Sequence, residues 1–168
     1  MNMSSILASL KVGLALTAGA FFVVPAPAAA EANAVIDFSK TDPAMEAAKT
    51  KARSNIATFW SAYAAPKAGE EGFALKVGFP THGTNAEHIW ISDVKREGVG
   101  RYSGRFANEP RDLEGQRAGD GVEFTEAQIS DWMFVRNGKW VGAETVRPMI
   151  ARMPKDLAAR YRQRYETP

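Results

Sequence analysis

Hydrophobic residues change their spacing along the chain, from helical steps to strict alternation and back, and each change predicts a new element. From Met45 to Tyr63 the apolar residues recur at steps of three and four, which gathers them on one helix face. Asp42 and Pro43 precede this run, and both favour a helix start, because Asp accepts hydrogen bonds from free amides and Pro fits the first turn. We predict one helix that ends before Pro66.

Strict alternation begins after Gly72 and predicts a series of strands. The predicted strands cover residues 73–79, 87–94, 101–106, 122–124, 131–135 and 140–141, with a turn at residues 95–100. Thr125 and Gln128 have the spacing of a helical capping box. Asn137-Gly138 favours a tight hairpin, because both residue types tolerate a positive φ.

The C-terminal residues predict short helices, with Thr145 as a cap of the first and a break at Pro154. Leu157, Tyr161 and Tyr165 recur every four residues on one side of the last helix. A helix, then consecutive strands joined by tight turns, then helices is typical of the α+β class. We expect the N-terminal helix to pack on a strongly curved, half-open barrel-like antiparallel sheet of about five to six strands.

The first thirty positions have the order of a secretory signal peptide. Lys11 precedes an uncharged run from Val12 to Val24, and small residues and prolines follow up to Ala30. The run is shorter than the roughly 20 residues that a membrane-spanning helix needs. We expect cleavage after Ala30 and a periplasmic or secreted protein without a stable membrane anchor; an uncleaved anchor is the alternative. We divide the chain into a signal peptide (1–30), a lead-in segment (31–41) with a possible edge strand at 35–38, an α+β domain (42–147) and a C-terminal helical extension (148–168).

Charge and composition exclude several classes of function. Residues 1–30 contain one Lys and no acid, so 20 of the 21 basic side chains and all 19 acidic ones remain after cleavage. A nearly neutral domain has no strong field to attract nucleic acid, so we expect no nucleic-acid partner. With no cysteine and two histidines, we expect no structural zinc site, no other metal site and no cofactor.

The stretch from Gly69 to Arg147 resembles domain-of-unknown-function family 2314, the bacterial YegJ-like proteins. The residues that carry the resemblance are Gly72–Val77, Glu87–Asp93, Ala107–Pro110, Gly119–Phe124 and Ile129–Met133, followed by the Asn-Gly hairpin. The resemblance implies a compact domain of this type, often exported. It implies no reaction, so the function has to be argued from the residues.

His88 and Trp90 form the first candidate binding site. On a strand they share one face, opposite to Ile89 and Ile91. An imidazole beside an indole offers a proton donor or acceptor and a stacking surface, which suits recognition of a ligand or peptide. The alternative is a structural histidine bonded to the backbone, with Trp90 packed against a helix.

Ser130-Asp131-Trp132 is a second candidate motif, with Asp131 and Trp132 as its binding residues, and Asn108 and Glu109 form a third candidate site. Asp131 would orient His88 if their strands were neighbours, which would make a carboxylate–imidazole pair for general base catalysis. In the alternative, Asp131 satisfies backbone amides and Trp132 fills the core. Asn108 and Glu109 precede Pro110 in a shaped loop, where turn chemistry explains them as well as a binding role does.

Motifs for catalysis are missing from the sequence. Gly98-Val99-Gly100 lies between strands, so no helix N-terminus meets an anion there, and Ser103 lacks the spacing of a nucleophile elbow. The basic residues of the C-terminal helix are explained by a solvated face. We therefore expect a non-enzymatic, exported binding module for an unknown protein, peptide or envelope ligand. The alternatives are a small hydrolase that uses His88 with Asp131 or Glu109, and a purely structural domain.

Overall fold

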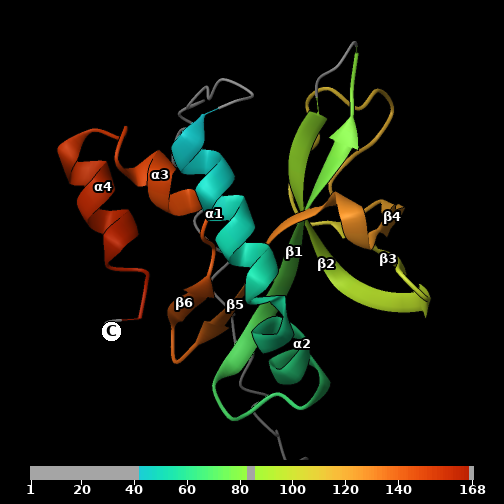
Figure 1. Ribbon diagram of the computed structural model, residues 1–168, viewed down its shortest axis with the longest axis horizontal. Helices are drawn as coiled ribbons and strands as arrows, with labels where there is room; N and C mark the ends of the chain where they lie inside the picture. Colours follow the sequence, from blue (N-terminus) through green and yellow to red (C-terminus); the bar gives the residue numbers. More distant parts are fainter. Residues whose placement is uncertain (1–41, 83–85, 167–168) are drawn as a thin grey trace, which may run out of the picture. The chain divides into compact units, whose positions relative to one another are not determined.

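The computed structural model describes residues 42–82 and 86–166, and six antiparallel strands form one open sheet in it (Figure 1). The strands are β1 (Glu70–Pro80), β2 (Ala86–Gly98), β3 (Arg101–Phe106), β4 (Gly121–Thr125), β5 (Ile129–Arg136) and β6 (Lys139–Gly142). Their order across the sheet is β4-β3-β2-β1-β5-β6. Together with the helices this confirms the α+β prediction. The predicted signal peptide, and the lead-in with its edge strand at 35–38, lie outside the described residues.

The helices are α1 (Pro43–Ser54), α2 (Ile56–Ala64), the 3₁₀ turn η1 (Glu126–Gln128), α3 (Val146–Ile150) and α4 (Lys155–Arg162). Asp42 caps α1 as predicted, because its Oδ1 accepts a hydrogen bond from the Met45 amide at 3.0 Å. The prediction of one continuous helix was wrong, since the backbone leaves helical geometry at Asn55 (φ −108°, ψ 11°). The apolar spacing continues across this break, which hides it from the pattern.

One apolar core fills the space between α1, α2 and the concave face of the sheet. The side chains of Phe59, Leu75 and Phe134 are fully buried in it. Aromatic rings make much of the packing, and Phe59 stacks on Tyr63 with ring centroids 5.5 Å apart. The alternation that predicted β1 is confirmed, because Leu75, Val77 and Phe79 face this core.

The C-terminal helices cover a second, smaller cluster that contains Ala143, Ile150, Ala158 and Tyr165. The chain beyond α4 also closes the outer edge of β6: the Trp140 amide donates to the Arg164 carbonyl, and Tyr165 forms a parallel bridge to Trp140. Residues 148–166 thus pack on the sheet. In the ranges 42–82 and 86–166, none of the helices combines the length and apolar character that a membrane crossing requires.

One local prediction was wrong, one was confirmed in part and two were confirmed. Strand β2 does not end at Val94 but runs to Gly98, with an irregularity in its pairing to β3 where Asp93 has a φ of 51°. Thr145 is the N-cap residue of α3, as predicted, but makes no side-chain capping hydrogen bond, because its hydroxyl donates to a buried carboxylate instead. The Thr125–Gln128 capping box is present. The Asn137-Gly138 hairpin is also present, with φ angles of 50° and 76°.

Candidate functional site

Two rows of paired residues lie on the face of the sheet opposite to Leu75 and Val77. In the first row Gly78 of β1 lies opposite His88 of β2. In the second row Lys76 lies between Trp90 of β2 and Asp131 of β5. Because alternate residues of a strand point to the same side, these side chains share one face.

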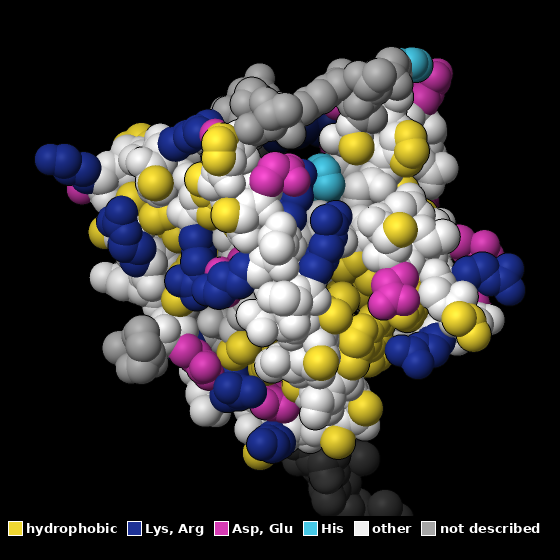
Figure 2. Space-filling view, viewed as in Figure 1, with side chains coloured by type: hydrophobic (Ala, Val, Ile, Leu, Met, Phe, Trp, Pro, Cys, Tyr) yellow, Lys and Arg dark blue, Asp and Glu magenta, His cyan; other side chains and the backbone are white. Residues whose placement is uncertain are grey.

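We call the surface around His88 the His88 face. It consists of His88, Trp90 and Lys76 from the sheet and of Lys49 and Arg53 from the neighbouring helix α1. Arg53 is anchored beside the sheet because its Nε donates to the Ile129 carbonyl at 2.9 Å. Figure 2 shows a face of the molecule on which histidine side chains reach the surface and basic and acidic side chains are interspersed. His88 and Trp90 are both half-buried.

A β-bulge at Ser130 sets the orientation of the His88 ring. Lys76 pairs with Asp131 and Val77 with Ile129, so Ser130 is the extra residue in β5. Its Oγ lies 3.1 Å from the Lys76 carbonyl oxygen and 2.8 Å from His88 Nδ1. Since the hydroxyl has one hydrogen and donates it to the carbonyl, His88 Nδ1–H donates to Oγ. Nε2 therefore keeps its lone pair and accepts hydrogen bonds.

Gly78 makes room for this arrangement. A Cβ atom at Gly78 would lie 2.9 Å from His88 Cε1 and 3.2 Å from Nδ1, closer than real contacts allow. The imidazole ring therefore lies directly against the backbone of β1. A glycine inside a strand is typical of such a close approach.

The surroundings of His88 hold its ring in the neutral form. Burial, together with the positive charges of Lys49, Lys76 and Arg53, lowers the pKa of His88 to about 4, against the raising effect of Glu46. At neutral pH the ring is therefore an uncharged acceptor surrounded by cations.

Lys76 connects the His88 face to the buried carboxylate of Asp131. Its Nζ donates to Thr145 Oγ1 at 3.1 Å, and the Thr145 hydroxyl donates to Asp131 Oδ2 at 2.7 Å. The ammonium group also lies 5.3 Å from the centroid of the Trp90 ring, within cation–π range. Burial lowers the pKa of Lys76, while the negative charge of Asp131 raises it.

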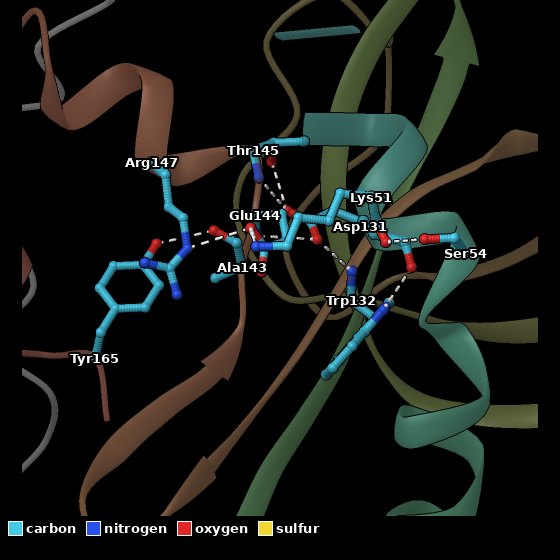
Figure 3. A network of polar contacts seen from close by, with 10 residues as sticks. Lys51, Ser54, Asp131, Trp132, Ala143, Glu144, Thr145, Arg147 and Tyr165 are labelled. Atoms are coloured by element: carbon cyan, nitrogen blue, oxygen red, sulfur yellow. Dashed lines mark hydrogen bonds and ion pairs between the residues drawn. The ribbon is translucent and has the colours of Figure 1, made fainter. Parts of the chain in front are cut away.

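Asp131 is fully buried and accepts four hydrogen bonds. Besides the Thr145 hydroxyl, its donors are the backbone amides of Trp132 (2.8 Å), Glu144 (3.2 Å) and Thr145 (2.7 Å). Figure 3 shows the carboxylate pointing toward the Ala143–Thr145 segment. The Glu144 side chain extends the network to α1 through an ion pair with Lys51 at 3.1 Å. Asp131 thus ties β5 to the chain that leads into α3.

The structure does not bring His88 and Asp131 together as a catalytic pair. Strand β1 lies between their strands, Nδ1 of His88 faces Ser130, and the Asp131 oxygens accept the four hydrogen bonds above. Trp132 is 4% exposed and donates from Nε1 to the Ala52 carbonyl at 2.8 Å. For Asp131 and Trp132 the structure therefore supports the alternative, in which they satisfy backbone groups and fill the core.

Asn108 and Glu109 are exposed and shape the loop after β3. Asn108 Oδ1 accepts a hydrogen bond from the Trp90 amide at 3.1 Å. This bond holds the loop after β3 against β2, next to the His88 face. Glu109 Oε2 accepts from the Ala118 amide at 3.0 Å. Glu87 also anchors this loop, through the Arg111 and Asp112 amides. Both side chains thus accept hydrogen bonds from backbone amides and hold the loop in shape.

The sequence interpretation did not identify Lys76 and Gly78 as parts of the site, and it gave Ser130 of the Ser130-Asp131-Trp132 motif no role. A glycine within the alternating run 73–79 was the available signal, because it marks a close approach of another group. Ser130 gave no signal of its own, since a bulge is defined by the pairing of two strands. In residues 42–82 and 86–166, no three His, Asp or Glu side chains gather in a way that would hold a metal ion.

Two cavities of about 540 and 610 Å³ lie beside β4, away from the His88 face. The first is lined by residues such as Phe79, Phe106 and Leu113, and the second by residues such as Lys95 and Arg105. Neither contains His88 or Trp90.

Comparison with known proteins places residues 42–166 in a family described as "Uncharacterized protein conserved in bacteria (DUF2314)". The chain is 32% identical to the uncharacterized protein YegJ of Escherichia coli (strain K12) over 92 residues, which cover 55% of this chain and 59% of that protein. It is 38% identical over 74 residues to a putative ankyrin repeat protein of Neisseria meningitidis serogroup B, covering 44% of this chain and 29% of that protein. The chain therefore spans less than two thirds of each relative. No solved structure matches it.

Proposed function

We propose, from the premise that this chain belongs to the DUF2314 family of bacterial proteins, that it is an exported binding module that recognises its ligand through the His88 face. The observation that carries the proposal is the fixed orientation of the imidazole. A bulge in β5, a serine hydroxyl and a glycine in β1 all serve to hold one half-buried ring against the sheet. Bulges often re-aim side chains at functional sites.

The properties of His88 favour recognition over acid–base catalysis. An efficient general base has a pKa near the working pH, and burial with nearby cations lowers the pKa of His88 to about 4. Its Nδ1–H donates to the Ser130 hydroxyl. A catalytic base, in contrast, is usually oriented by a carboxylate. A neutral ring with a fixed acceptor is well suited to select a ligand that donates a hydrogen bond.

Trp90 gives the proposed surface its apolar part. Its ring is half-buried and lies two residues from His88 on the same side of β2. Tryptophan is among the residue types that contribute most to binding energy when a partner covers them. A polar acceptor beside an indole therefore offers both selectivity and affinity.

Export is the second part of the proposal, and it predicts a specific cleavage. The uncharged run 12–24 and the small residues up to Ala30 support it. A C-terminally tagged chain expressed in a bacterium is expected in the periplasmic fraction, with Glu31 as its first residue by mass spectrometry. Stable recovery of the chain with Met1 from the cytosol would refute export.

Replacing Gly78 by Ala is expected to impair ligand capture although the residues His88 and Trp90 themselves are unchanged. The new Cβ would displace the imidazole ring, and because the ring is the end of a side chain, the backbone of β1 need not move. Trp90→Ala should weaken capture more strongly, by about 2 kcal/mol or more. The purified wild-type and variant chains are compared in pulldowns from bacterial envelope extract.

Gly121→Ala is the matched control, because a Cβ at Gly121 of β4 meets nothing within 4 Å. It is expected to capture the same partners as the wild type. If the wild type, Gly78→Ala and Trp90→Ala captured identical sets of molecules, the His88 face would not be the recognition surface.

A further inference from the structure

We propose that the His88 face binds an acidic ligand that carries a hydroxyl group beside its acid group, as in an acidic sugar. The inference rests on the proposed function and names the ligand chemistry of the same surface. It combines the charges around His88, the acceptor on its ring and the indole of Trp90.

The charge around His88 selects for an anion. Lys49 and Arg53 of α1 and Lys76 of β1 surround the ring, and Glu46 is the acidic side chain that acts on it from α1. Glu46 pairs with Lys49 at 2.8 Å, so one of the three cations is neutralised. Lys76 faces the buried carboxylate of Asp131 through the Thr145 hydroxyl, so the three cations exceed the two acids by one positive charge. A carboxylate or phosphate would gain from this excess.

The acceptor on His88 adds a second requirement. Nε2 keeps its lone pair because Nδ1–H donates to Ser130. An anion by itself has no hydrogen to offer Nε2, so a fully deprotonated acid leaves this acceptor unused. A ligand with a hydroxyl next to its acid group donates to Nε2 while the cations hold the acid.

Trp90 completes the match with a sugar. Its half-buried indole lies next to Lys76, whose ammonium group is 5.3 Å from the ring centroid. An indole face packs well against the C–H groups of a sugar ring, because both surfaces are apolar and flat. The acid group of such a sugar would then lie near Lys76.

The test measures binding of small probes to the purified chain by NMR, with the indole Nε1–H of Trp90 and the ring nitrogens of His88 as reporters. Glucuronate and glucose 6-phosphate distinguish a carboxylate from a phosphate source. Glucose tests the need for the acid, and acetate, which is deprotonated and has no hydroxyl, tests the need for the hydroxyl. We expect both acidic sugars to shift the reporters in a saturable, salt-sensitive way, and glucose and acetate to bind at least about tenfold more weakly.

Two variants on α1 are expected to change the affinity in opposite directions. Lys49→Gln should weaken binding of the acidic sugars by about threefold to tenfold, and Glu46→Gln should strengthen it by a similar factor. Both residues lie in a partly exposed pair within one helix, so neither change threatens the fold. Lys155→Gln, on the exposed start of α4, is the control and should have no effect.

The inference fails if glucose or acetate binds as tightly as the acidic sugars, or if Lys49→Gln and Glu46→Gln leave their affinity unchanged. It also fails if only an acidic peptide, and no acidic sugar, shifts the reporters. The proposed function is judged separately. If envelope capture depends on Gly78 and Trp90 while no acidic sugar binds, recognition by this face stands and the ligand class is wrong.

Discussion

Replacing Asp131 by Asn is expected to lower the free energy of unfolding by about 3–5 kcal/mol, a large part of the stability of a domain of this size. The carboxylate is fully buried and accepts four hydrogen bonds, three from backbone amides and one from the Thr145 hydroxyl. An Asn side chain has one acceptor oxygen, and its NH₂ group would face two of these donors. Buried donors left without an acceptor are costly.

The prediction also tests the ionisation of Asp131. Burial raises the pKa of this carboxyl group, whereas the hydrogen bonds from Thr145 and Trp132 and the charge of Lys76 lower it. Four donors leave no place for a proton on either oxygen, so we expect the charged form in the folded protein. If the group were protonated, Asn would replace it at little cost.

Denaturant unfolding at neutral pH measures the difference. Asp120→Asn is the control, because Asp120 is exposed and its Oδ2 accepts one hydrogen bond, from the Arg117 amide at 2.8 Å. We expect the control to lie within about 1 kcal/mol of the wild type. A value that close for Asp131→Asn would show that the network in Figure 3 contributes little to stability.

Much of the fold follows from local patterns, because each of them needs only a few neighbouring residues. The alternation of residues 73–79, the cap at Asp42 and the Asn137-Gly138 turn were each predicted from residue types at fixed spacing. The break at Asn55 was missed because helical periodicity is almost unchanged by one irregular residue. Residues 95–98 at the end of β2 were predicted as a turn because a local pattern does not show that they pair with β3.

The candidate site was predicted in part, and the missing part depends on strand order. His88 and Trp90 share a half-buried face, as the alternation of β2 predicted. The sequence left open whether the strands of Asp131 and His88 are neighbours, and in the structure β1 separates them. What reaches His88 is Ser130, one residue away, because the bulge shifts the register by one position. Such a shift arises from pairing and has no local signature.

The stability of the wild type is expected to fall by about 2 kcal/mol more than that of His88→Asn when the pH is lowered from 7.5 to 4.5. The ordinary pKa of His is 6.5, and burial with the cations Lys49, Lys76 and Arg53 lowers it to about 4 in the folded protein, against the opposing charge of Glu46. Between these values the unfolded chain binds a proton that the folded chain does not. Stability contributed by neutral His88 is therefore complete above pH 6.5 and is lost as the pH falls toward 4.

Asn is the appropriate replacement, because its side-chain NH₂ lies where Nδ1–H lies and keeps the hydrogen bond to Ser130. The full difference between the two pKa values corresponds to about 3 kcal/mol, and the partial exposure of the ring reduces the expected effect to about 2 kcal/mol. Glu46, Asp131 and other acids titrate in both proteins, so their contributions cancel when the two unfolding curves are subtracted. If the two proteins lost stability in parallel over this pH range, the imidazole would be protonated in the fold as readily as in water. The surroundings of His88 would then not hold its ring neutral, and the acceptor on which the recognition proposal depends would be lost as the pH falls through 6.5.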